Sequence, residues 1–283
     1  MAPFDIKSLG DWITEVESAP TPLWLLEDLL AADSMIMVTG KAKRAFKTWL
    51  VFLMSMSASS GKSYGLLKPA RPANGLIIEV EGARKPTANR FKMIERGTGL
   101  SLAQCPNLYM MHQQRFFLED KHSIAQLGQF IKERNIQFIV LDTLVKLSRG
   151  DENDAREMTI ALNGIEELRK HNQASAIYIH HTSKPGSHPK DIDDEIRGSS
   201  ALAGAFDQHF AIRMAPQNPK ELHMTVVSKD HEEKFFILSW HIDKHTQAAK
   251  LSIQQVTEFP EQEDDDTLEP SNNLKKRHWR DKR

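Results

Sequence analysis

The sequence has very little cysteine and no long apolar stretch, and each absence excludes a class of protein. Among its 283 residues there is one cysteine, Cys105, so neither a disulfide framework nor a thiolate cluster for zinc can form within the chain. The longest apolar run, Trp49–Met54, is far shorter than the ~20 residues that a membrane-spanning helix needs. The first residues include Asp5 and lack the basic and apolar segments of a secretory signal. We therefore expect a cytoplasmic protein with no membrane partner.

Positive charge is not in excess either, since 37 Lys and Arg residues face 38 Asp and Glu residues, a formal net charge of −1. This balance conceals an acidic block over 261–269 and a basic block over 275–283. We interpret 1–33 as an N-terminal lead-in and 34–256 as the folded core. The polar composition of 257–283 predicts a disordered, acidic-then-basic tail.

Apolar runs and amphipathic patterns alternate through most of the chain. The apolar runs predict strands at 34–38, 75–81, 108–111, 138–142 and 176–181. Helical patterns lie between them at 87–95, 123–134 and 155–171, and another is expected at 6–17. This alternation predicts an α/β fold, in which a mostly parallel sheet is flanked by helices on both faces. The last runs, at 210–214, 222–228, 235–242 and 250–256, have no helices between them, so we expect the sheet to end in antiparallel strands.

The segment from Gly40 to Thr48 is the strongest chemical signal. It lies between a buried strand and an apolar helix, where a phosphate-binding loop presents backbone N–H groups and a helix N-terminus to phosphates. Lys47 and Thr48 fit the lysine that reaches the phosphates and the hydroxyl that binds Mg²⁺. Phe46 stands where the second glycine of such a loop is usual, which leaves an ordinary strand-to-helix turn as the alternative. Gly61-Lys62-Ser63 spells the same ending but follows a helix, so we interpret Gly61 as a helix C-cap.

Three acidic residues follow or end predicted strands. Asp142 ends a buried strand, where ligands bind in parallel sheets, and could hold Mg²⁺; its alternative role is a loop cap. Glu79 and Glu81 lie on the same side of another strand. Glu81, nearer the strand end, is the better candidate for the base that activates water, with solvated strand-end acids as the alternative.

Two adjacent histidines, His180 and His181, come at the end of another apolar strand. A polar side chain there can sense a γ-phosphate and move the loop that follows. Because adjacent residues of a strand point to opposite faces, at most one of the two can do so. A metal site at this pair would need a third ligand nearby, for which His188 is the candidate, and we disfavour it.

Taken together, these residues resemble the RecA/DnaB-type ATPases, and most closely the RepA-like hexameric helicases of plasmids and phages. The similarity runs from about Pro22 to about Val256. It rests on Pro22–Leu25, the Gly40–Thr48 loop, Glu81, Val140–Thr143, His180–Lys184, Arg197–Leu202 and Asp207. The resemblance implies a RecA-like twisted sheet, ATP and Mg²⁺ at the subunit interfaces of a hexameric ring, and single-stranded DNA in the central channel.

The resemblance also implies roles for individual residues. The catalytic candidates are Glu81, Lys47, His180, His181 and Lys229, the last as a finger that reaches a neighbouring subunit's γ-phosphate, with Arg213 in reserve. The nucleotide-binding candidates are Gly40, Lys43, Arg44, Ala45, Phe46, Lys47, Thr48, Trp49 and Asp142. Thr48 and Asp142 are the candidate Mg²⁺ ligands. Asp230 follows Lys229 where the family often has an arginine, which departs from the family pattern.

DNA contacts are expected from the loops that follow the Asp142 and His180–His181 strands. Their basic residues are Lys146, Arg149, Lys184, Lys190 and Arg197, enough to neutralise a few phosphates in a salt-dependent way. The same loops are rich in Asp and Glu and have no aromatic side chain, so plain solvated loops are the alternative. Trp279 in the basic tail could stack on a base, or the tail could only aid solubility.

We therefore expect an ATP-dependent ring ATPase that acts on DNA, replicative-helicase-like, from a plasmid, phage or mobile element, with a recruiting protein as a further partner. The alternative is an oligomeric DNA scaffold that binds nucleotide and hydrolyses it slowly or not at all, such as a loader or a transposition or recombination regulator. A third alternative is an interaction module with a vestigial nucleotide site.

Overall fold

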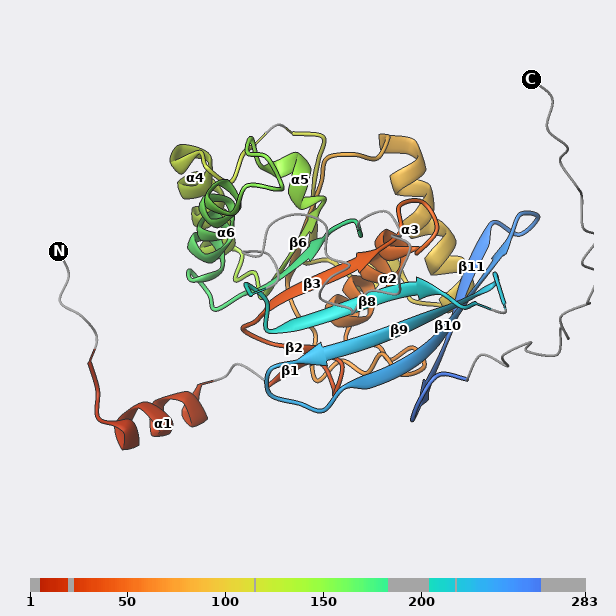
Figure 1. Ribbon diagram of the computed structural model, residues 1–283, viewed down its shortest axis with the longest axis horizontal. Coiled ribbons are helices and arrows are strands. Elements are labelled where there is room, and N and C mark those ends of the chain that lie inside the picture. Colours follow the sequence, from red (N-terminus) through yellow and green to blue (C-terminus); the bar gives the residue numbers. More distant parts are fainter. Residues whose placement is uncertain (1–5, 20–22, 115, 183–203, 217, 261–283) are drawn as a thin grey trace, which may run out of the picture.

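The computed structural model describes residues 6–19, 23–114, 116–182, 204–216 and 218–260, and most of these form a twisted sheet between two layers of helices (Figure 1). The helices are α1 (Leu9–Ser18), α2 (Lys47–Ser60), α3 (Arg84–Thr98), α4 (Lys121–Glu133), α5 (Leu144–Leu147) and α6 (Ala155–Arg169), with a 3-10 turn at Leu102–Gln104. The strands are β1 (Trp24–Leu26), β2 (Leu30–Ala31), β3 (Met35–Gly40), β4 (Gly75–Glu79), β5 (Leu108–His112), β6 (Phe138–Asp142), β7 (Ser175–Ile179), β8 (Gln208–Met214), β9 (Glu221–Ser228), β10 (Lys234–Asp243) and β11 (Ala248–Val256).

Nine strands of the described residues form one sheet, in the order β11-β10-β9-β8-β3-β7-β6-β4-β5. The strands from β8 to β5 in this order are parallel, whereas β9, β10 and β11 are antiparallel to their neighbours. The predicted α/β class, with its mostly parallel sheet and antiparallel end, is confirmed. One of the strands expected to be antiparallel differs from the prediction. Strand β8 pairs parallel with β3, and the antiparallel pairings begin only between β8 and β9.

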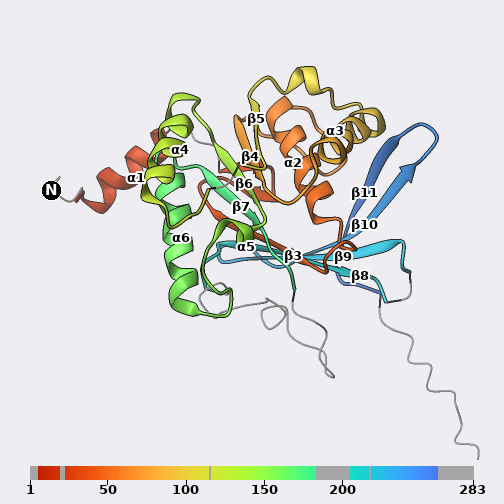
Figure 2. The same cartoon turned by 90° about the horizontal axis from the view of Figure 1, so that it is seen from above.

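Both faces of the sheet are covered, since its central strands β3, β4, β6 and β7 are buried at every position. In β6, Phe138 and Val140 pack on the side of α2 and α3, while Ile139 and Leu141 pack on the side of α4 and α6. Figure 2 shows these two helical layers on opposite sides of the sheet. Alternate side chains of one strand thus supply two separate cores, as expected for parallel strands buried on both faces.

The segment before β3 has two different parts. Leu25 and Leu26, with Leu29 and Leu30, are buried in the core beneath α2 and form the short antiparallel pair β1–β2. Helix α1, by contrast, has no buried residue and stands away from the sheet (Figure 1). In the described ranges, no helix combines the length and apolarity needed to cross a bilayer.

Helix limits follow local chemistry. Helix α2 ends where Gly61 takes a left-handed conformation, φ +66°, and donates its N–H to Ser57, as a glycine C-cap does. Helix α3 begins at Arg84, before the predicted 87, because Pro86 is tolerated in a first turn that needs no N–H donor. Strand β4 ends at Glu79 rather than at the predicted 81, and Glu81 therefore lies in the turn that follows.

Helix α3 packs closely on β11, and the contact passes through Gly97. A Cβ atom on Gly97 would lie 2.0 Å from the carbonyl oxygen of Ala249, a backbone atom that cannot rotate away. A glycine at this helical position therefore allows the late antiparallel strands to rest against α3.

We predict that Gly97→Ala lowers the free energy of unfolding by about 1–3 kcal/mol, because the forced backbone shift outweighs alanine's better helix propensity. Gly10→Ala in α1 is the matched control, since nothing lies within 4 Å of a Cβ atom there. Denaturant unfolding of both variants measures the effect. Equal stability of Gly97→Ala and the wild type would contradict the close packing.

Candidate functional site

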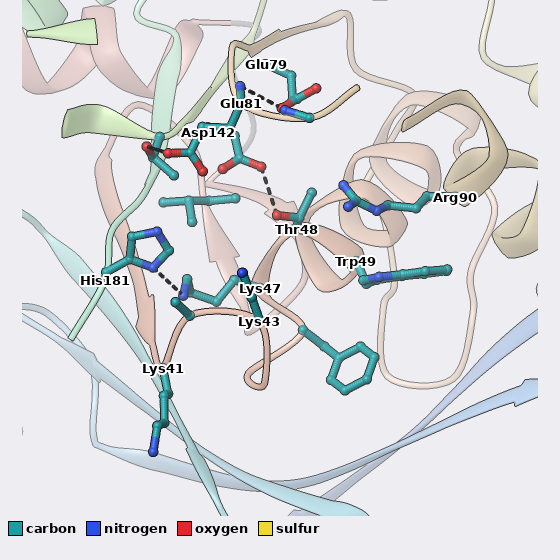
Figure 3. A pocket seen from close by; sticks show the side chains of 15 residues that line it. Lys41, Lys43, Lys47, Thr48, Trp49, Glu79, Glu81, Arg90, Asp142 and His181 are labelled. Carbon is teal, nitrogen blue, oxygen red and sulfur yellow. Dashed lines mark hydrogen bonds between the residues drawn. The ribbon is translucent and has the colours of Figure 1, made fainter. Parts of the chain in front are cut away.

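The carboxyl ends of β3, β4, β6 and β7 meet at one edge of the sheet, and a cavity of about 450 Å³ opens there (Figure 3). Its lining combines four predicted elements of the site: the loop after β3, the turn after β4, the end of β6 and the residue pair after β7. Its lining residues are Lys41, Ala42, Lys43, Phe46, Lys47, Thr48, Trp49, Glu79, Glu81, Gly82, Arg90, Asp142, Thr143, Ile179 and His181.

The loop after β3 keeps a tight path although it lacks the second glycine. Gly40 permits a close approach, because a Cβ atom there would lie 2.6 Å from the carbonyl oxygen of Ile212. Phe46 itself takes the left-handed conformation, φ +49°, which a glycine adopts more readily. Its ring stacks on Trp240 of β10 at 6.3 Å between centroids, and Trp49 packs on the same indole at 5.6 Å. Aromatic packing thus holds Phe46 in a conformation that its backbone disfavours.

Lys47 begins α2 and is almost fully buried at the base of the cavity. Its Nζ donates to the carbonyl oxygen of Gly40 at 2.5 Å and lies 3.2 Å from Nδ1 of His181. Burial lowers the pKa of Lys47 to about 8, against the opposing effect of the Asp142 and Glu81 carboxylates. An anion in the cavity would compensate the buried positive charge.

Thr48 and Asp142 form a direct link between the loop and the sheet. Thr48 Oγ1 donates to Asp142 Oδ2 at 2.8 Å. Burial raises the pKa of Asp142 to about 6, the Thr48 hydrogen bond lowers it, and the nearby carboxylates of Glu79 and Glu81 raise it further. A divalent cation beside Asp142 would stabilise its ionised form.

Glu81 and Glu79 occupy different environments in the turn after β4. Glu81 is exposed in the cavity and accepts a hydrogen bond from Thr143 Oγ1 at 3.1 Å. Glu79 is buried, and its oxygens accept from the backbone N–H groups of Glu81 and Gly82 and from Thr87. The interpretation of Glu81 as the more available carboxylate therefore agrees with the geometry.

The histidine pair divides between core and cavity. His180 is fully buried, and its backbone N–H donates to Val38 at 3.0 Å. His181 lines the cavity beside Lys47. Of the two predicted sensors, His181 is the one that a bound phosphate can meet.

Lys41, Arg90 and Thr143 are among the cavity residues to which the sequence analysis gave no individual role. Lys41 and Arg90 add positive charge to the lining, and Thr143 contacts Glu81. Arg90 lies on α3, three residues after Thr87, and so on the same face of the helix. This helical spacing from the turn after β4 was the sequence signal that could have placed Arg90 at the cavity. Nothing in the local sequence indicated Lys41 apart from its position next to Gly40.

Other predicted residues lie away from this cavity or outside the described residues. Arg44 is exposed on the loop but does not line the cavity, and Ala45 is buried beside Gly40. Lys229 follows Ser228, which pairs with Gln208 at the opposite edge of the sheet, and its Nζ contacts Asp207 at 3.1 Å. Arg213, the reserve finger, lies next to the cavity edge, since Ile212 pairs with Gly40.

The predicted DNA-binding residues are only partly described. Lys146 and Arg149 are exposed after β6, and the Arg149 guanidinium lies 4.4 Å above the Phe117 ring. The candidates outside the described residues are Lys184, Lys190, Arg197 and the tail residue Trp279. The alternative metal ligand His188 and almost all of the predicted tail also lie outside them.

Comparison with known families agrees with this geometry. A family model described as an AAA domain, AAA_25, matches residues 4–187, which is more than half of the chain. The chain belongs to the AAA_25 family. These P-loop AAA-type domains occur in RecA/DnaB-like helicases, so the suspected family is confirmed, as is its RecA-like fold. The chain matches none of the curated proteins.

The donor set fits a nucleotide with Mg²⁺. One wall of the cavity supplies the cations Lys41, Lys43 and Lys47, which suit phosphates, and the other supplies carboxylates. In the part of the chain that the structure describes, no group of three or more His, Cys, Asp or Glu side chains could hold a metal alone. Mg²⁺ commonly takes one or two protein ligands and completes its shell with phosphates and water, which is what Thr48 and Asp142 allow.

We predict that Asp142→Asn stabilises the ligand-free protein at pH 7.5 by about 2–3 kcal/mol. The folded-state pKa of about 6 exceeds the ordinary 3.8, so folding is penalised above pH 6 and the penalty disappears as the pH falls toward 4. Unfolding in EDTA at several pH values measures the difference between the variant and the wild type. A difference that does not shrink between pH 7.5 and 4.5 would contradict the raised pKa.

The conformation of Phe46 gives a second prediction. Phe46→Ala and Phe46→Gly both remove the ring, but only alanine keeps the Cβ atom that disfavours φ +49°. We expect the glycine variant to be more stable than the alanine variant by about 1 kcal/mol. Parallel denaturant unfolding of the two proteins measures this, and the reverse order would rule out a left-handed Phe46.

Proposed function

We propose that this P-loop protein is a Mg²⁺-dependent ATPase that works as an oligomeric ring on single-stranded DNA, in the manner of a replicative helicase of a plasmid, phage or mobile element. One observation carries the proposal: Lys47, Thr48, Asp142 and Glu81 line a single cavity at the carboxyl edge of the sheet. These four side chains supply a phosphate-binding cation, two groups for Mg²⁺ and an available base.

Binding of ATP would first change the contacts of Lys47. Its amine now donates to the Gly40 carbonyl, and a β- or γ-phosphate oxygen would be a stronger, charged acceptor. Thr48 and Asp142 would hold Mg²⁺, which supplies neutralisation of the charge on the phosphates. The backbone N–H groups at the start of α2 face the same cavity edge and add a favourable dipole.

Glu81 would then orient the attacking water and accept its proton. Its carboxylate is exposed to the cavity, and Thr143 Oγ1 fixes one of its oxygens. His181 lies beside Lys47 and would meet the γ-phosphate, so its position would depend on whether that phosphate is present. In the sequence, Lys184 follows three residues later, which links phosphate sensing to the loop expected to contact DNA.

Self-association has independent support from α1. Its side chains Leu9, Trp12, Ile13 and Val16 share one face at helical spacing and are 42–71% exposed. Among the described residues this apolar face has no partner, and such a face favours burial against another chain. A ring would also give Lys229 or Arg213 a neighbour's γ-phosphate to approach.

DNA binding is supported by exposed cations near the cavity, chiefly Lys146 and Arg149 on the segment after β6. Arg149 already stacks on Phe117, which leaves fewer of its contacts for phosphates. The neighbouring Asp151 and Asp154 weaken the local positive field. We therefore expect weak binding that falls steeply with salt.

The second candidate is the oligomeric scaffold that binds nucleotide but turns it over slowly. The departure at Phe46 favours it, because a bulky residue in the left-handed conformation takes the place of the second glycine of the phosphate-binding loop. A loader, or a regulator of transposition or recombination, would depend on nucleotide binding more than on nucleotide hydrolysis.

We predict DNA-stimulated ATP hydrolysis that Lys47→Ala abolishes and that Glu81→Gln lowers by about 10²- to 10⁴-fold with ATP still bound. Lys62→Ala is the matched control, because Lys62 belongs to the similar Gly61-Lys62-Ser63 sequence but is exposed after α2. Phosphate release is measured with and without single-stranded DNA, at 50 and 200 mM salt.

The outcomes separate the candidates. Turnover that is lost in both site variants and retained in the control supports the ATPase. ATP binding without turnover in the wild type favours the scaffold, and no ATP binding contradicts both. Unwinding of a forked duplex would then decide between a helicase and another DNA-dependent ATPase.

A further inference from the structure

A second carboxylate, that of Glu79, lies directly behind Glu81 in the wall of the cavity. Glu79 ends β4, next to Asp142 in the sheet, and its side chain is only 1% exposed. Such a burial is unfavourable for a carboxylate unless hydrogen bonds satisfy its oxygens. The contacts of Glu79 show how the chain meets this requirement, and two of them reach the turn that carries Glu81.

Both oxygens of Glu79 are engaged. Oε1 accepts from the backbone N–H of Glu81 at 3.0 Å and from the backbone N–H of Gly82. Oε2 accepts from Thr87 Oγ1 at 3.0 Å and lies 3.0 Å from Nε2 of His112. One oxygen therefore holds the backbone of the turn, and the other is held by Thr87 of α3 and lies beside His112 of β5.

The turn has little room to relax around this carboxylate. A Cβ atom on Gly82 would lie 2.6 Å from Thr87 Oγ1 and 2.8 Å from a Glu79 oxygen. Gln113 adds a second connection from β5, since its N–H donates to the Glu79 carbonyl at 2.8 Å and its side chain donates to the Gly82 carbonyl at 2.9 Å. The direction of the Glu81 side chain is thus set by a backbone that Glu79 fixes from inside.

The two carboxylates are suited to different tasks. Glu79 already accepts three hydrogen bonds, from Glu81, Gly82 and Thr87, so it has little capacity left to accept a proton from water. Within the described part of the chain, the Glu81 carboxylate accepts one hydrogen bond, from Thr143, and it is open to the cavity. Glu79 therefore fits a group that acts through another residue rather than on the reacting atoms.

We propose that Glu79 is a positioning residue for Glu81: it clamps the Glu81–Gly82 backbone, and the Thr87 hydroxyl holds it in place. This inference rests on the proposed ATPase function and deepens it. A carboxylate base displaced by about 1 Å loses on the order of 10²-fold in rate. The clamp matters for turnover and not for holding ATP, because Lys47, Thr48 and Asp142 belong to other elements.

The decisive experiment is a double-mutant cycle on ATP turnover. Glu79→Gln replaces the carboxylate with a neutral amide. This weakens the contacts with the N–H groups of Glu81 and Gly82 and replaces the oxygen that accepts from Thr87 with an NH₂ group. We expect kcat to fall about 10- to 100-fold, with KM and nucleotide affinity unchanged. Because Glu79 acts through Glu81, the double variant with Glu81→Gln should be no slower than Glu81→Gln alone. Turnover is divided by the number of ATP-binding sites titrated in each protein.

A milder pair of variants keeps the test valid if Glu79→Gln does not fold. Thr87→Val removes the hydroxyl that holds Glu79 and should lower kcat, whereas Thr87→Ser should restore it. Thr98→Val is the matched control on the same helix, since its hydroxyl donates to the Ile94 carbonyl, away from the site.

Several results would overturn the inference. An unchanged kcat in Glu79→Gln and Thr87→Val, or a rate loss in Glu79→Gln that multiplies with that of Glu81→Gln, contradicts positioning while ATPase activity stands. A rise in KM alone would assign Glu79 to nucleotide binding. A wild type that binds ATP without turnover overturns the proposed hydrolysis together with this inference.

Discussion

The hydrogen bond from Thr48 to Asp142 is the contact on which the arrangement of the site depends. It joins the first turn of α2 to the end of β6, two elements far apart in the sequence. The bond forms only because β3 and β6 run parallel, with β7 between them, so that both end at the same edge. Lys47 precedes Thr48, and Thr143 follows Asp142 to reach Glu81. One contact therefore links the half of the cavity that carries Lys47 to the half that carries Glu81.

The charges around this bond are not balanced in the ligand-free chain. The carboxylates of Glu79 and Glu81 raise the pKa of the already buried Asp142, and burial lowers the pKa of Lys47. The site thus holds carboxylates that favour a divalent cation and a desolvated amine that favours an anion. A nucleotide with Mg²⁺ supplies both charges at once, which neither a metal alone nor an anion alone would do.

Sequence patterns were sufficient for the features that depend on local periodicity and on strand ends. Continuous apolar strands predicted the parallel sheet, and their terminal residues placed Asp142, Glu81 and the histidine pair at one edge. Period-two alternation put Glu79 and Glu81 on one side of a strand, but it could not indicate that the Glu79 oxygens accept hydrogen bonds from Thr87 and from the turn that carries Glu81. The sequence likewise could not indicate at which edge of the sheet Lys229 lies, because this depends on the pairing of β9 with β8.

Phe46 shows why the remaining part required the folded chain. Local rules count its left-handed backbone as strained, and they gave no reason for a large ring in place of glycine. The reason lies in β10, where Trp240 packs against both Phe46 and Trp49. Because β11 also rests on α3 through Gly97, the late strands support the phosphate-binding loop and the helix after Glu81 at the same time. The antiparallel end of the sheet is thus part of the framework that gives the nucleotide cavity its shape.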